Sequence, residues 1–282
     1  MRPGEPLLII CYSFPPNFGI GGRRWAKFAK EFARLGHTVH VIRSAGDPAR
    51  TGSLWSGDVE RPGIIAHPLL QRYPTVLSKR PLTTVMEKVM YRVWSRVLPL
   101  LSKGNWYDPA ALLKRQLLAE SGRLITMHGI RNVVVSGAPF SLMAHVTGLK
   151  KRFPGIHLVA DFRDPWTWGP YYGQASLSER RMDHERAQEA LVVRTFDKLI
   201  SPRTGVIEHL RTRYGGPDQR YVTIPHAIDL DDLPPPSIGS GSSGDFKMIY
   251  AGSLYGAEEA EAYFDKLILA FEKLRENRPD SF

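Results

Sequence analysis

Short runs of apolar residues recur along the chain as far as residue 225, separated by longer stretches with helical periodicity. The first run, at residues 7–14, reads LLIICYSF. Continuous apolar runs, as opposed to alternating ones, are typical of strands buried on both faces of a sheet. Strands that alternate with helices predict an α/β fold, a Rossmann-like parallel sheet covered by helices. The expected strands span residues 7–14, 39–42, 64–70, 133–136, 157–161, 198–201 and 221–225.

A change of composition marks the end of this pattern. Residues 233–245 read LPPPSIGSGSSGD, which is typical of a linker. Beyond it the pattern predicts one strand, 246–254, and one helix, 259–278. A single strand and helix bury too little surface to close a parallel sheet. The sequence therefore predicts a domain at 1–232, a linker at 233–245, and the first βα unit of a second, incomplete domain at 246–282.

Charge is unevenly distributed over the 282 residues. Lys and Arg number 38 against 28 Asp and Glu, a net charge of +10. Residues 71–131 hold 11 basic and 3 acidic residues and so carry +8 of it. A localised excess indicates one basic face toward an anionic partner such as a membrane surface, and it disfavours a general nucleic-acid coat.

The sequence predicts no disulfide, no metal site and no signal peptide. Cys11 is the one cysteine, so no internal disulfide is possible, and there is no uninterrupted apolar run of 18 residues. The nine His residues show no metal-site spacing, so we expect no metal and no cofactor. The N-terminus lacks the features of a signal peptide, and we expect a cytoplasmic protein.

A glycine-rich segment follows the first strand. Gly19, Gly21 and Gly22 precede Arg23 and Arg24 at the start of a helical stretch. Glycines allow a close approach of the backbone, and a helix N-terminus favours a phosphate or sugar oxygen. The two arginines can add charge-assisted hydrogen bonds. The alternative is a structural glycine turn with two solvated arginines.

The same segment loosely matches a dinucleotide fingerprint. Gly19-x-Gly21 has the right start, but Arg24 stands where a third small residue is usual. Arg43 and Ser44, after the second strand, suit a 2′-phosphate. An NAD(P)-binding oxidoreductase is therefore a further alternative.

Charged and aromatic residues gather where two other strands end. Asp161, Arg163, Asp164 and Trp166 follow the fifth predicted strand, and Ser136 ends the fourth. Ligands of open parallel sheets bind outside the carboxyl ends of the strands. We expect the two aspartates to accept a proton or a sugar hydrogen bond, Arg163 to hold a carboxylate, and Trp166 to stack on a sugar. The alternative is a salt-bridged loop with a buried Trp.

A basic amphipathic helix is predicted over residues 85–98. Lys88, Arg92 and Arg96 recur every four residues on one stripe, and Trp94 lies among them. Such a helix can lie in an anionic membrane interface. The alternative is that its apolar stripe packs on the protein's own sheet while the charges are solvated. The apolar stripe consists of Met86, Val89, Met90, Val93 and Val97.

Seven segments in order along the chain resemble the retaining GT-B glycosyltransferases of the group 1, or family four, type. The resemblance implies two Rossmann-like domains that face a cleft, with the acceptor held mainly by the first and a nucleoside diphosphate sugar mainly by the second. The matching segments are 14–24, 36–41, 136–141, 161–166, 201–202, 224–229 and 250–254.

The resemblance also implies a reaction and site residues. It implies transfer of a glycosyl unit to an acceptor hydroxyl with retained configuration, without metal, in cell-envelope or extracellular polysaccharide synthesis. By resemblance Gly21 and Gly22 approach the donor phosphate or the acceptor, and Gly252 and Ser253 belong to a substrate-binding loop. The acceptor would be a glycan or a lipid-linked glycan, with the protein peripheral on the inner face of the membrane.

Two departures from the family pattern keep other functions open. His226 and Ala227 replace the usual Asn-Gly, and the sequence ends before the basic residues and paired glutamates that hold the donor in the family. The alternatives are an inactive fragment and a non-catalytic partner subunit that docks on membrane.

Overall fold

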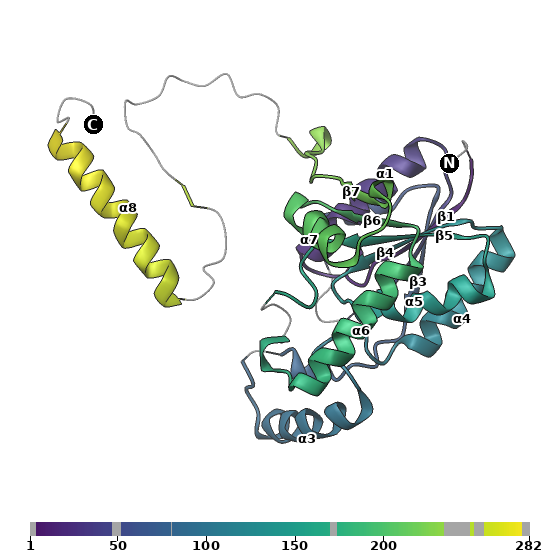
Figure 1. The fold of residues 1–282 in the computed structure, drawn as a ribbon, viewed down its shortest axis with the longest axis horizontal. Helices are drawn as coiled ribbons and strands as arrows, with labels where there is room; N and C mark the ends of the chain where they lie inside the picture. The colour runs from purple at the N-terminus through teal and green to yellow at the C-terminus, as the bar shows by residue number, and fades with distance from the viewer. Residues whose placement is uncertain are drawn as a thin grey trace. The chain divides into compact units, whose positions relative to one another are not determined.

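The fold is a parallel sheet with helices on both faces (Figure 1). The computed structural model describes residues 4–46, 52–79, 81–169, 174–233, 249–250 and 257–277. Seven strands lie in the order β3-β2-β1-β4-β5-β6-β7, and every neighbouring pair is parallel. The strands are β1 (Leu7–Ile10), β2 (Val39–Ser44), β3 (Ile64–Leu69), β4 (Asn132–Gly137), β5 (His157–Phe162), β6 (Lys198–Ser201) and β7 (Tyr221–Thr223).

Helices connect successive strands. Each crossover returns the chain to the same end of the sheet, so all the carboxyl ends of the strands lie at one edge. The helices are α1 (Arg23–Arg34), α2 (Ser56–Val59), α3 (Val85–Leu101), α4 (Lys114–His128), α5 (Ser141–Arg152), α6 (Glu179–Thr195), α7 (Thr204–Tyr214) and α8 (Ala257–Asn277).

Two hydrophobic cores lie on opposite faces of the sheet. Leu8 and Ile10 of β1 face the larger core, which includes buried residues of α4, α5, α6 and α7. Leu7 and Ile9 face the smaller core with Trp25 of α1. This division explains the continuous apolar run in the sequence, because neighbouring residues of one strand are buried on opposite sides.

The parallel α/β fold predicted from the sequence is confirmed, and all seven expected strands are present. The first is shorter than expected and ends at Ile10, because a turn begins there with Phe14 N–H donating to the Cys11 carbonyl (3.3 Å). The strand expected at 246–254 lies outside the described residues, apart from residues 249–250. By contacts the chain divides into residues 1–228 and 229–282.

The order of the strands places a switch point between β1 and β4. Leu7 of β1 pairs with Val39 of β2 on one side and with Asn132 of β4 on the other. The chain leaves β1 toward β2 and β3, and then returns to build β4 to β7 on the opposite side. The loops after β1 and β4 therefore separate at the carboxyl edge, which is where open parallel sheets bind ligands.

One buried histidine makes the stability of this fold sensitive to pH. His40 of β2 is buried, its Nδ1 lies 3.1 Å from His67 Nε2, and the centre of its ring lies 4.2 Å from that of His128. Burial, reinforced by His128, His67 and Arg123, lowers the pKa of His40 to about 4. Its contribution to stability is therefore fully present above the unfolded pKa of about 6.5 and is lost as the pH falls toward the folded value.

We expect wild-type protein to lose on the order of 1–2 kcal/mol of unfolding free energy between pH 7 and pH 5 through His40. Urea unfolding of wild type and His40→Gln at both pH values measures this, and the variant should lose less. His157→Gln, which changes an exposed histidine, is the matched control. Equal pH dependence in wild type and His40→Gln would contradict the assignment.

Candidate functional site

A cavity of about 420 Å³ opens at the switch point. Tyr12 and Ser13 reach it from the loop after β1, and residues 138–140 reach it from the loop after β4. A concave, largely apolar cavity with a few polar groups is the usual form of a small-molecule site. We call it the switch-point cavity. Its aromatic wall is formed by Tyr12, Tyr73, Tyr107, Phe140 and Trp166.

Two carboxyl groups are among the polar groups that line it. Asp108 accepts hydrogen bonds from Ser141 N (2.9 Å), Ser141 Oγ (2.6 Å) and Ala110 N (2.8 Å), and burial raises its pKa to about 6. Glu185 accepts from Asn105 N and Trp166 Nε1, both at 2.7 Å, and burial raises its pKa as well. At neutral pH Asp108 is therefore largely ionised, and the oxygens of both carboxyl groups can accept hydrogen bonds from ligand hydroxyls.

The sequence interpretation missed most of this cavity. Tyr73, Tyr107, Asp108 and Glu185 come from three separate segments that only the fold assembles. One local signal was available. Residues 105–108 read NWYD between two helical stretches, and clustered aromatic and polar residues in a loop are typical of binding sites.

The glycine loop packs against the protein's own backbone. A Cβ on Gly22 would lie 2.2 Å from the Ser13 carbonyl oxygen, whereas one on Gly21 would lie 3.2 Å from Ser13 Cβ. Gly19 has a φ of 110°, which favours glycine. Gly22 is therefore required where α1 begins against the end of β1, a reason that differs from the predicted approach to a ligand.

Arg163 ties the glycine loop to the loop after β4. Its Nε donates to the Gly137 carbonyl and its Nη2 to the Ala138 carbonyl, both at 2.9 Å, and its Nη1 donates to the Gly21 carbonyl. One guanidinium thus holds both loops that border the switch-point cavity. Planar guanidinium groups suit such multiple contacts because their five donors are fixed in a fork.

Asp161 lies beneath these loops at the centre of a buried polar cluster. Its Oδ2 accepts from Trp25 Nε1 (2.7 Å) and Ser136 Oγ (3.2 Å), and it lies 3.5 Å from Arg24 Nε. Burial raises the pKa of Asp161, opposed mainly by Arg24. Arg24 also donates to the carbonyls of Ile224 (2.9 Å) and residue 225 (3.2 Å). This cluster joins α1, β4, β5 and the segment after β7.

The remaining predicted residues lie in different surroundings. Asp164 is partly exposed, and Arg23 lies with its guanidinium 6.0 Å from the centre of the Trp55 ring. Trp166 is 1% exposed, and its ring stacks on that of Phe140 with the ring centres 5.0 Å apart. It is therefore a buried part of the cavity wall. The predicted Gly252 and Ser253 lie outside the described residues.

The nicotinamide alternative receives no support from the second strand. Ser44 is 2% exposed, and its Oγ accepts from the Gly46 N–H (3.1 Å). Arg43 donates to the Ser44 carbonyl (2.8 Å). Since the predicted third-glycine position holds the buried Arg24, the loop also lacks the small residue that a dinucleotide needs there.

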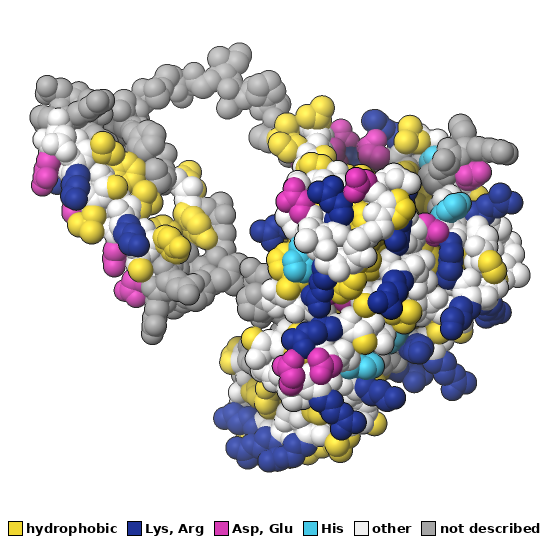
Figure 2. Space-filling view, in the orientation of Figure 1, with side chains coloured by type: hydrophobic (Ala, Val, Ile, Leu, Met, Phe, Trp, Pro, Cys, Tyr) yellow, Lys and Arg dark blue, Asp and Glu magenta, His cyan; other side chains and the backbone are white. Residues whose placement is uncertain are grey.

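Helix α3 carries Lys88, Arg92, Trp94 and Arg96, none of which lines the switch-point cavity. Its one buried residue is Leu98, so its apolar stripe does not pack on the sheet. Figure 2 shows Lys and Arg gathered with hydrophobic side chains over this helix. We call its exposed apolar residues the α3 apolar face: Val85, Met86, Val89, Met90, Val93, Val97, Leu100 and Leu101, between 37% and 85% exposed.

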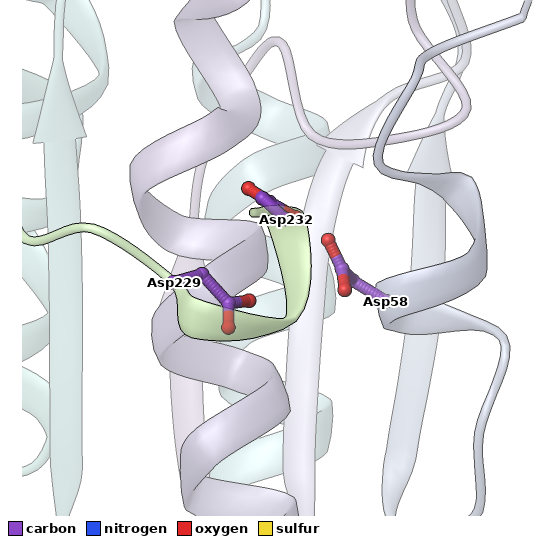
Figure 3. A group of neighbouring side chains, drawn as sticks. All are labelled: Asp58, Asp229 and Asp232. Carbon is purple, nitrogen blue, oxygen red and sulfur yellow. The ribbon is translucent and has the colours of Figure 1, made fainter. Parts of the chain in front are cut away.

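The acidic side chains drawn in Figure 3 have contacts within their own parts of the chain. Asp58 of α2 pairs with Lys27 (2.7 Å) and Lys30 (3.5 Å). Asp229 accepts from Asp231 N (3.1 Å) at the start of the 3₁₀ turn Leu230–Asp232. Since carboxylates with such contacts do not by themselves make a cation site, we assign no metal to them.

These features define a class of protein, an α/β domain with a cavity at the switch point of its parallel sheet. The chain belongs to Glycosyltransferase Family 4, whose family model matches residues 21–232 of the 282. Membership of this family excludes the alternative of an NAD(P)-binding oxidoreductase.

Solved structures with a similar fold include several glycosyltransferases. Apo UGT2 of Phytolacca americana has 11% identity and a TM-score of 0.44 over 85% of this chain and 53% of its own. LpCGTa in complex with UDP has 10% identity and a TM-score of 0.42 over 86% of this chain and 61% of its own. The chain thus spans little more than half the length of these structures. A comparison with curated proteins finds no match.

Proposed function

We propose that this chain is the acceptor-side domain of a retaining glycosyltransferase that transfers a sugar from a nucleoside diphosphate sugar to an acceptor hydroxyl, in the synthesis of cell-envelope or extracellular polysaccharide. The observation that carries the proposal is the switch-point cavity in a Family 4 chain. Its aromatic wall suits stacking on a sugar ring, and its two carboxyl groups suit hydrogen bonds from sugar hydroxyls.

The reaction requires different tasks of the acceptor-side domain and of the second domain. The bond between the anomeric carbon and the diphosphate oxygen breaks, the acceptor oxygen bonds to the same carbon, and the hydroxyl proton leaves. Stabilising the departing diphosphate is the main electrostatic task, and the resemblance gives it to the second domain, where Gly252 and Ser253 belong to a substrate-binding loop. On the acceptor side, Asp161 and Arg163 act as positioning residues that hold the glycine loop, and Asp164 is the partly exposed carboxylate beside them.

Acceptor binding tests this function. Titration with simple glycosides should give a measurable affinity that falls by about fivefold in Tyr107→Ala, because a lost ring contact is worth about 1 kcal/mol. Tyr107→Phe keeps the ring and is the matched control, expected to bind nearly as wild type does. Nucleoside diphosphate affinity should be the same in all three proteins. Glycoside binding that is absent, or unchanged in Tyr107→Ala, would contradict an acceptor site here.

A second function has its own observation. The α3 apolar face is exposed and is flanked by Lys88, Arg92 and Arg96, a combination that favours docking on an anionic membrane surface. We propose that the protein lies peripherally on the inner face of the membrane through α3. Among the described helices, none is both long and apolar enough to cross a bilayer.

Vesicle binding measures this docking. Reversing Lys88, Arg92 and Arg96 to Glu should lower affinity for anionic vesicles by at least about 100-fold, because each cation near the surface contributes about 1 kcal/mol. Reversing the exposed Arg131, Lys151 and Arg203 is the matched control, with the same change of net charge. Equal losses in the two variants would show a general charge effect and refute docking through α3.

The non-catalytic alternatives predict different results. A docking subunit would bind vesicles with no glycoside affinity, and an inactive fragment would bind neither glycosides nor nucleoside diphosphates. Both titrations therefore separate these functions from a glycosyltransferase.

A further inference from the structure

A second cavity of about 570 Å³ lies between the last turn of α3 and the first turns of α6. We call it the α3–α6 cavity. Four side chains that carry or can accept positive charge line it, together with two hydroxyls, and no described carboxylate does. The polar lining consists of Ser102, Lys103, Ser178, Arg180, Arg181 and His184.

Arg181 builds the wall of this cavity. Its Nη1 donates to the carbonyls of Ser102 (2.7 Å) and Gly104 (2.8 Å), and its Nη2 donates to the Pro99 carbonyl. These contacts fix the end of α3 against α6, so the cavity keeps its shape without a ligand. Because these carbonyls occupy its donors, Arg181 contributes positive charge to the cavity wall and has a structural role.

The other cations are available to a ligand. Lys103 and Arg180 are exposed and form no ion pair among the described residues. The neighbouring Glu179 is engaged elsewhere, with Arg186 2.5 Å from its carboxylate. Burial lowers the pKa of His184, and the charges of Lys103 and Arg181 lower it further. A cavity lined by several cations and by no described carboxylate suits a phosphate group, whose oxygens accept charge-assisted hydrogen bonds.

The α3–α6 cavity also adjoins the α3 apolar face. Leu100 lines the cavity and is 85% exposed, and the next residue, Leu101, is 60% exposed. A ligand at this place therefore meets cations and a hydrocarbon surface together. A soluble phosphate contacts the cations alone. A lipid phosphate contacts the cations and the apolar surface, because its headgroup enters the cavity while its chain stays in the membrane beside α3.

We propose that the α3–α6 cavity binds the phosphomonoester or diphosphate headgroup of a lipid. The site rests on the membrane docking proposed above. A phosphomonoester has three unesterified oxygens and up to two negative charges, so it makes more charge-assisted hydrogen bonds to Lys103 and Arg180 than a phosphodiester does. The headgroup would thereby select which lipid is brought to the carboxyl edge of the sheet.

Two vesicle types of equal surface potential test the selection, one containing phosphatidic acid and the other phosphatidylglycerol. We expect wild type to prefer phosphatidic acid by about tenfold, the gain of one or two charge-assisted hydrogen bonds. Lys103→Gln with Arg180→Gln should remove the preference and leave binding to phosphatidylglycerol within about twofold. Lys88→Gln with Arg92→Gln, the matched control on α3, should weaken both equally.

The other possible results of these experiments each support or overturn the lipid-phosphate site. Wild type without a preference, or a preference kept in Lys103→Gln with Arg180→Gln, would overturn the site. Dihexanoyl phosphatidic acid, titrated as a soluble monomer, separates the site from docking, since binding there without vesicle binding would refute α3 docking and leave the cavity supported. Binding of inorganic pyrophosphate without binding of this short lipid would overturn the lipid assignment. Both variants change exposed side chains, so their thermal unfolding should match that of wild type.

Discussion

Asp161→Ala is expected to lower the free energy of unfolding by about 3–5 kcal/mol, because it removes one partner of a buried ion pair. The side chains of Asp161 and Arg24 are 0% and 3% exposed. Without the carboxylate, the Arg24 charge stays buried with only carbonyl partners. Trp25 Nε1 and Ser136 Oγ lose their acceptor as well. Each of these donors adds a cost of its own when it is left unpaired.

Urea unfolding followed by far-ultraviolet circular dichroism measures this loss without relying on the fluorescence of the adjacent Trp25. Asp183→Ala is the matched control, because Asp183 forms an exposed pair with Arg186 (2.8 Å) and should cost less than about 1 kcal/mol. Asp161→Asn should fall between the two, since it keeps an acceptor oxygen and removes the charge. A loss in Asp161→Ala no larger than in Asp183→Ala would refute a central structural role.

Gly22→Ala is expected to cost about 3 kcal/mol or more, the upper range for overpacking, because its methyl group has no space. A Cβ there would lie 2.2 Å from the Ser13 carbonyl oxygen and 3.0 Å from Phe14 Cα. Both are backbone atoms, so no side-chain rotation relieves the contact. The φ of −92° at Gly22 suits alanine, which makes the clash the sole cause of the loss.

Gly21→Ala provides the neighbouring control. Its Cβ would meet the side chain of Ser13 at 3.2 Å, a contact that a small shift relieves, so we expect a loss below about 1 kcal/mol. Thermal unfolding of both variants gives the comparison, and proteolysis of the loop gives a second measure if Gly22→Ala is too unstable to purify. Similar stability of the two variants would show that the loop moves freely away from Ser13.

The polar residues at the strand ends show how far prediction of the site could go. The sequence placed Asp161, Arg163 and Ser136 at the carboxyl edge, because they follow apolar runs that read as parallel strands. It did not predict that Asp161 and Ser136 lie beneath the surface, or that Arg163 holds the Gly21 and Gly137 carbonyls. Burial depends on what α1 and the loops place above the strand ends, which strand periodicity does not encode.

Helix α3 shows the same division on the surface. Its periodicity predicted an amphipathic helix with three cations on one stripe, and α3 spans Val85–Leu101 as an amphipathic helix. Whether the apolar stripe faced the sheet or solvent was open, since both arrangements have the same pattern. The structure decides for exposure, because Leu98 alone of this helix is buried.

The sequence by itself determined the parallel α/β fold, the order of its strands along the chain, and the position of the basic residues. These follow from local periodicity, since burial of a strand or helix leaves its mark on consecutive residues. Only the tertiary structure decided the aromatic wall of the switch-point cavity, the Asp161 cluster and the α3–α6 cavity. Their members are far apart in sequence, and their contacts arise only when the sheet order brings the loops together.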